Sequence, residues 1–177
     1  MDKLASRNVA KVIDLLSERL AFERASVKLY DTLIARVRAS DVVGLRELAV
    51  GLERHREQEK EHEEWLEEQI RALGGDAQLP TEQSLLADAE SEGVERVIRR
   101  DNKIAHDFHA LLTAELADNA GWELLARIAA EMGDGPAQAQ FERRLSEEEE
   151  HLALVRRTLL SLTKEEVSAP PPQHPAD

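Results

Sequence analysis

The chain has 177 residues, of which 42% are hydrophobic and 33% charged, and its formal net charge is −13 at pH 7. This length allows one domain with a substantial core, whereas the acidic charge excludes DNA and RNA partners, because a phosphate backbone must be neutralised by Lys and Arg. The absence of cysteine excludes disulfides, thiolate metal sites and cysteine nucleophiles.

Leu, Ala, Glu and Arg dominate the composition, and these residues favour long α-helices. No segment alternates polar and apolar residues with enrichment in β-branched side chains, so we predict an all-α fold. No uncharged segment is long enough to span a bilayer, and no signal peptide is recognisable. We therefore expect a cytoplasmic protein with no membrane partner.

The first two predicted helices form a pair. Ser6 or Asn8 can cap the first helix, and Ser40 or Asp41 can cap the second after a very short turn. The second helix ends at a Gly-Gly pair, residues 74–75, which is a common C-terminal signal. Because the turn between the two helices is so short, we expect them to be antiparallel.

A long connection, residues 76–97, follows this pair. It contains Pro80 and Gly93 and leaves room for only a short helix, near residues 85–92. We interpret it as a crossover outside the bundle core. A connection of this length can span the bundle, so that the third bundle helix runs parallel to the second.

The third bundle helix is predicted at about residues 98–132. A Gly-Asp-Gly-Pro turn then starts the fourth helix, which we expect to end near Thr163. The proline-rich tail, residues 166–177, has no periodic apolar face and is predicted to be disordered. The sequence thus predicts one four-helix bundle over residues 1–165, with one long crossover between its second and third helices.

A glutamate interrupts the apolar stripe of each long helix. Glu115, for example, lies seven residues after Phe108 and seven before Trp122. Two of the four acids begin a Glu-x-x-His motif, whose Glu and His share a helix face. The six residues are Glu23, Glu59, His62, Glu115, Glu148 and His151.

Four carboxylates that meet in one core repel each other unless they are protonated or compensated by cations. No Lys or Arg occupies the stripe positions beside them, although Lys60 and Arg144 flank the face. Two divalent metal ions would supply the missing positive charge. Carboxylate oxygens and imidazole nitrogens suit iron or manganese, so the sequence predicts a dinuclear metal site.

The order of lone Glu, Glu-x-x-His, lone Glu and Glu-x-x-His resembles the ferritin-like di-iron carboxylate superfamily over residues 6–163. The resemblance implies a ferritin-like four-helix bundle with two Fe ions as cofactor, or Mn in their place. It implies that Glu23 and Glu115 each bind one metal ion terminally and that Glu59 and Glu148 bridge the two. It also implies that His62 and His151 each bind one ion. The segments around Tyr30 and Glu115 are similar to small bacterial ferritin-like domains of unassigned activity.

We therefore expect a non-haem di-iron protein that reacts with dioxygen or peroxide, as a ferroxidase or peroxidase, with the same six residues as its catalytic groups. Three alternatives stay open. The chain could be a dimanganese catalase-like enzyme, a subunit of an iron-storage shell, or a non-catalytic helical stress protein with partly exposed acids. A homo-oligomer is compatible with each.

A few further residues have weaker signals. Tyr30 and Trp122 lie one heptad beyond the lone acids; we assign them first to core packing, with hydrogen bonding to a ligand or electron transfer as alternatives. His55 is interpreted as a polar residue lining the cavity rather than as an extra ligand. Asn119 is predicted to hydrogen-bond a ligand carboxylate, and Glu147 could replace Glu148 but has a poorer register.

Overall fold

The structure is a computed structural model that describes residues 1–41 and 44–169. Within these ranges it consists of helices and contains no strand, which confirms the all-α prediction. The five helices are α1 (Asp2–Ala39), α2 (Leu45–Ala72), α3 (Glu82–Arg100), α4 (Ile104–Glu131) and α5 (Gly135–Ser168). None of these helices has an apolar stretch that could cross a membrane.

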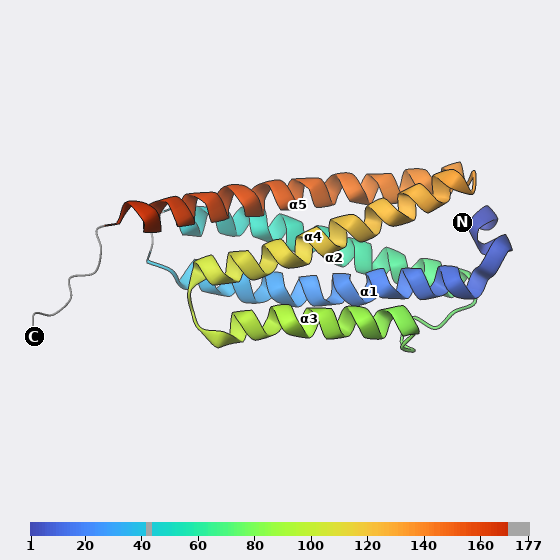
Figure 1. The fold of residues 1–177 in the computed structure, drawn as a ribbon, viewed down its shortest axis with the longest axis horizontal. Coiled ribbons are helices and arrows are strands. Elements are labelled where there is room, and N and C mark those ends of the chain that lie inside the picture. The colour runs from blue at the N-terminus through green and yellow to red at the C-terminus, as the bar shows by residue number, and fades with distance from the viewer. Residues whose placement is uncertain (42–43, 170–177) are drawn as a thin grey trace, which may run out of the picture.

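Four of the helices form the predicted bundle (Figure 1). The bundle is made of two antiparallel pairs, α1 with α2 and α4 with α5, and α1 also packs against α4. The chain crosses the length of the bundle between α2 and α4, so these two helices run in the same direction. The predicted crossover and the parallel course of the second and third bundle helices are therefore confirmed.

The crossover differs from its prediction because most of it is the helix α3. A capping box starts this helix: the Thr81 hydroxyl accepts from Ser84 N, and Ser84 Oγ accepts from Thr81 N. Gly93 lies on the exposed face of α3, where a glycine is about 1 kcal/mol less favourable in a helix than an alanine. The opposite face buries Ala87 and Ile98, and the helix packs on α1 and α4. Tertiary packing therefore extends a helix that local sequence signals underestimated.

Several helix boundaries also differ from the prediction. The second helix has Gly44 at its N-cap rather than Ser40 or Asp41, and the third bundle helix starts at Ile104 rather than near residue 98.

The first helix starts at Asp2 and has one non-helical residue, Asn8, inside it. Its first turn is held by Asp134, whose carboxylate accepts hydrogen bonds from the backbone N–H of Lys3 and Leu4.

The last helix continues to Ser168 instead of ending near Thr163. The predicted tail, residues 166–177, therefore begins within α5, and its residues 170–177 lie outside the described residues.

Two apolar clusters fill the bundle on either side of its middle. One contains the buried side chains of Tyr30, Leu52, Phe108 and Val155, and the other those of Leu16, Leu66, Trp122 and Phe141. All four bundle helices contribute to both clusters. The polar layer that the sequence predicts therefore lies between two dry packing layers, which limits its access to water.

Candidate metal centre

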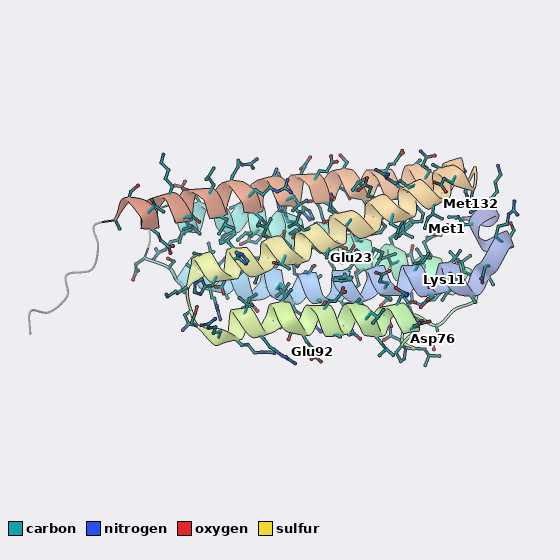
Figure 2. All side chains as sticks on the ribbon, in the orientation of Figure 1. Met1, Lys11, Glu23, Asp76, Glu92 and Met132 are labelled. Atoms are coloured by element: carbon teal, nitrogen blue, oxygen red, sulfur yellow. The ribbon has the colours of Figure 1, made fainter. Side chains whose placement is uncertain are left out.

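The structure brings all six predicted residues together in the middle of the bundle. They come from all four bundle helices, and each is at most 2% exposed. Glu23 on α1 is labelled in Figure 2 and shows where the centre lies along the bundle. The donor atoms form two groups, in each of which the atoms lie within 4.8 Å of one another: Glu23, Glu59, His62 and Glu148, and Glu59, Glu115, Glu148 and His151.

The two groups share Glu59 and Glu148, so they could hold two neighbouring ions with two carboxylates between them. His62 Nδ1 lies 3.1 Å from Glu148 Oε1. His151 Nδ1 lies 3.2 Å from Glu148 Oε2 and 3.2 Å from Glu59 Oε1. One imidazole therefore stands at each position, and the four carboxylates surround the pair.

Several of these donor atoms are buried without a hydrogen-bond partner. They are Glu23 Oε2, Glu59 Oε2, Glu115 Oε2, both oxygens of Glu148, and Nδ1 of His62. A buried polar atom without a partner costs about 1–3 kcal/mol. The contact between His62 and Glu148 is an ion pair and does not supply such a partner. Oxygen and imidazole donors converging in this way fit a pair of divalent cations.

The outer nitrogen of each imidazole is held by a residue of the facing helix. His62 Nε2 lies 2.7 Å from Glu147 Oε2, and His151 Nε2 lies 3.1 Å from Gln58 Oε1. A proton on each Nε2 donates to these acceptors, which leaves each Nδ1 directed to the carboxylates. Glu147 thus lies outside the donor groups and positions His62 from there.

Glu147 and Gln58 occupy equivalent places, each directly before the Glu of a Glu-x-x-His motif. Gln58 is not part of any motif recognised in the sequence. Its only signal is this equivalence to Glu147, since the contact itself depends on how two helices face each other.

The two buried aromatic residues each hold a lone acid of the opposite helix. The Tyr30 hydroxyl on α1 donates to Glu115 Oε1 on α4 at 2.6 Å. Trp122 Nε1 on α4 donates to Glu23 Oε1 on α1 at 2.9 Å. Both side chains are fully buried, so they pack the core and also fix the carboxylates. Burial, together with the charge of Glu115, raises the pKa of Tyr30 well above its usual value, which keeps it a donor.

The acids of the centre resist ionisation to different degrees. Burial raises the pKa of Glu59 well above its usual value, and the neighbouring charges of Glu148 and Glu23 add to the effect. Burial also raises the pKa of Glu115 to about 7. Burial opposes ionisation of Glu148 too, but the adjacent imidazoles of His151 and His62 outweigh it and lower its pKa to about 2.

The pKa values of the two imidazoles are raised despite their burial. Burial alone would lower their pKa, but the carboxylates around them raise it to about 12 for His62 and about 10 for His151. Without a metal ion, imidazolium protons therefore supply the compensating charge. A divalent cation would take the place of these protons.

His55 lies beside the centre but outside both donor groups. Its ring is 1% exposed and stacks on His151 with 4.3 Å between ring centroids. Burial, with the nearby positive charges of His151 and Arg54, lowers its pKa to about 3. Asn119 does not make the predicted hydrogen bond to a carboxylate, because its Nδ2 is buried without a partner.

A buried ion pair that the sequence does not predict lies next to the centre. Arg19 lies one turn before Glu23 on α1, is 2% exposed, and donates from one nitrogen to Asp118 Oδ1 at 2.7 Å. Arg19 is not one of the stripe positions, so its burial was not predicted. Asp118 itself is 1% exposed, and burial raises its pKa well above its usual value. Arg19 thus compensates a fifth acid rather than the four glutamates.

Gly121 makes room for this ion pair. A Cβ at Gly121 would lie 2.0 Å from Arg19 Cζ, so Gly121→Ala must push the guanidinium away from Asp118. We expect a loss of about 1–3 kcal/mol of stability, the cost of leaving buried polar groups unpaired. Gly93→Ala is the matched control, because its Cβ would meet nothing within 4 Å and a helical alanine is favourable. Denaturant unfolding of both metal-free variants tests this, and equal stabilities would contradict it.

Removing the acceptor on His62 should weaken metal binding without removing a donor. The hydrogen bond from His62 lowers the pKa of Glu147, which keeps Glu147 ionised as an acceptor. We expect Glu147→Ala to lower Mn(II) affinity by about 10–100-fold, the usual effect of losing such a contact. Glu149→Ala, a change of an exposed neighbour on the same helix, should leave affinity unchanged. Anaerobic calorimetric titration measures both; equal affinities would show that Glu147 does not position His62.

The fold is similar to that of a solved structure described as ferritin like, diiron-carboxylate proteins from Bacillus anthracis str. Ames. The TM-score is 0.66 at 18% sequence identity, and the alignment covers 85% of this chain and 96% of that chain. No family model matches the chain, and no curated protein matches its sequence. The likeness confirms the ferritin-like fold predicted from the sequence.

Proposed function

We propose that this chain is a non-haem di-iron protein that binds two iron ions in its bundle and reacts with dioxygen or hydrogen peroxide. In this proposal Glu59 and Glu148 would each hold both ions, because both belong to both donor groups. The terminal ligands are Glu23 with His62 at one ion and Glu115 with His151 at the other. The similar structure from Bacillus anthracis, described as a diiron-carboxylate protein, supports iron as the metal.

The observation that carries the proposal is the set of buried donor atoms without hydrogen-bond partners. Five carboxylate oxygens and one imidazole nitrogen of the centre are in this state. Of the two buried arginines in the described part of the chain, Arg19 is paired with Asp118 and Arg144 lies over the ring of Trp65. Burying such a cluster is favourable only when a cation or protons compensate it. Two divalent ions would satisfy the charge and the free lone pairs at once.

When bound, two Fe(II) ions can supply the two electrons that reduce hydrogen peroxide to water as both become Fe(III), with two protons taken up. The residues of the chain prepare this chemistry. Glu147 and Gln58 hold the outer nitrogens of the two imidazoles, and Tyr30 and Trp122 fix the lone carboxylates. The apolar clusters on both sides exclude water.

Iron oxidation kinetics test the proposal. The metal-free protein is loaded anaerobically with increasing equivalents of Fe(II), and each sample is then mixed with oxygen or hydrogen peroxide while Fe(III) formation is followed by absorbance. We expect oxidation faster than in buffer, with a break at two iron ions per chain, and loss of the break in His151→Ala. A rate no faster than in buffer would contradict the proposed reaction. Manganese retained in the isolated protein would instead favour a dimanganese enzyme.

A further inference from the structure

A surface cavity leads from the solvent to His55, between α2 and α5. It has a volume of about 270 Å³ and is lined by Gly51, Arg54, His55, Glu150, Ala153, Leu154 and Arg157. The two helices pack less closely on each other than α1 does on α2. Small side chains, Gly51 on one helix and Ala153 on the other, leave the opening.

The inner end of this cavity is one ring away from the metal centre. His55 lines the cavity and stacks on His151, with 4.3 Å between the ring centroids. His151 Nδ1 in turn lies 3.2 Å from Glu59 and from Glu148, the two shared carboxylates. A small molecule that displaced the His55 ring would therefore reach the side of the centre on which His151 stands.

The chemistry of the lining indicates what kind of molecule fits. Arg157 has no ion-pair partner among residues 1–41 and 44–169, whereas Arg54 lies 3.7 Å from Glu150. His55 Nδ1 is buried and has no hydrogen-bond partner, and its Nε2 lies 3.2 Å from Arg54. The cavity thus offers a net positive charge and the guanidinium hydrogen-bond donors of Arg54 and Arg157, on a chain of net charge −13. A local positive charge of this kind attracts small anions and polar molecules.

We propose that the cavity between α2 and α5 is the route by which a small hydrogen-bonding oxidant of the peroxide class reaches the metal centre, and that His55 is its gate. This inference rests on the proposed function and narrows it, because it favours hydrogen peroxide over dioxygen. Azide is a suitable probe, since it is small and anionic and its binding to Fe(III) is visible by absorbance.

The first test blocks the cavity. Ala153→Phe should fill the opening without touching a donor residue and slow azide association on the order of tenfold in iron-loaded, oxidised protein. Leu160→Phe is the control, because it makes a similar change at an exposed position of the same helix, outside the cavity. His55→Ala should have the opposite effect and speed azide association. Stopped-flow absorbance measures all three rates.

The second test changes the charge of the cavity lining. Arg157→Glu should slow azide association several-fold and make it less sensitive to salt. Arg156→Glu is the matched control, since it makes the same charge change at the exposed neighbouring residue, which does not line the cavity. Equal rates for Arg157→Glu and Arg156→Glu, together with an unchanged rate in Ala153→Phe, would overturn the route.

Iron content measured on the same samples separates the two proposals. Two iron ions per chain with unaltered azide rates in every variant would overturn the access route and leave the di-iron proposal standing. Wild-type protein that does not bind iron would overturn the di-iron proposal and, with it, the route. Two iron ions per chain with slower azide binding only in the cavity variants supports both.

Discussion

Glu148→Gln should abolish paired metal binding. The wild-type carboxylate belongs to both donor groups and lies 3.1–3.2 Å from both imidazoles. An amide of the same shape removes the charge and turns one oxygen into a donor that cannot bind a cation. Loss of a residue that only hydrogen-bonds a metal ligand lowers metal affinity by about 10–100-fold. Loss of a ligand shared by both ions should therefore lower the affinity further. We expect at most one metal ion per chain, measured by elemental analysis after dialysis.

Glu149→Gln is the matched control for this substitution. It makes the same chemical change at an exposed position on the same helix, one residue away, and should leave two ions per chain. Circular dichroism of both variants confirms that the helices are intact before metal is added. Retention of two ions by Glu148→Gln would mean that the buried carboxylate is not a shared ligand, and the proposed arrangement would then be wrong.

Metal binding should stabilise the fold by an amount that grows as pH rises. In the metal-free protein the pKa values of His62 and His151 are raised to about 12 and about 10, above the usual 6.5. Groups whose pKa is raised on folding stabilise the folded state fully below pH 6.5, and this contribution declines as pH increases toward their folded values. The raised pKa values of Glu59 and Glu115 act in the same direction. The metal-free protein therefore loses stability between pH 6.5 and 8.5.

The metal-loaded protein should not show this loss, since the ions have replaced the protons. At a free metal concentration one hundred times the dissociation constant, binding stabilises a protein by about 2.7 kcal/mol. Each proton displaced should add about 1.4 kcal/mol of metal binding free energy per pH unit. Thermal unfolding with and without Mn(II) at pH 6.5, 7.5 and 8.5 measures the difference. A difference in unfolding temperature that is constant or shrinks with pH would contradict the assignment of these imidazoles as ligands.

The six candidate residues could be predicted because helix periodicity fixes which side chains share a face. Glu115 repeats with Phe108 and Trp122 at seven-residue spacing, so its burial follows from theirs. The same reasoning applies to Glu-x-x-His, whose two side chains are neighbours on any helix. The convergence of four such faces followed from the crossover length, which sets the direction of the third bundle helix.

The contacts around these residues could not be predicted in the same way. Gln58 and Glu147 hold imidazoles across a helix interface, and such contacts depend on the rotation of each helix about its axis. Arg19 carries a charge that normally indicates a solvated face. Its burial requires both Asp118 and the absent side chain of Gly121 on another helix. The periodicity of one helix does not show which of its side chains will fit a particular side chain on another helix.

Crystallography of the iron-loaded protein, with anomalous diffraction at the iron edge, tests the central proposal most directly. We predict two anomalous peaks inside the bundle, both beside Glu59 and Glu148, with His62 at one and His151 at the other. Peaks confined to surface carboxylates, or a single peak distant from these six side chains, would contradict it.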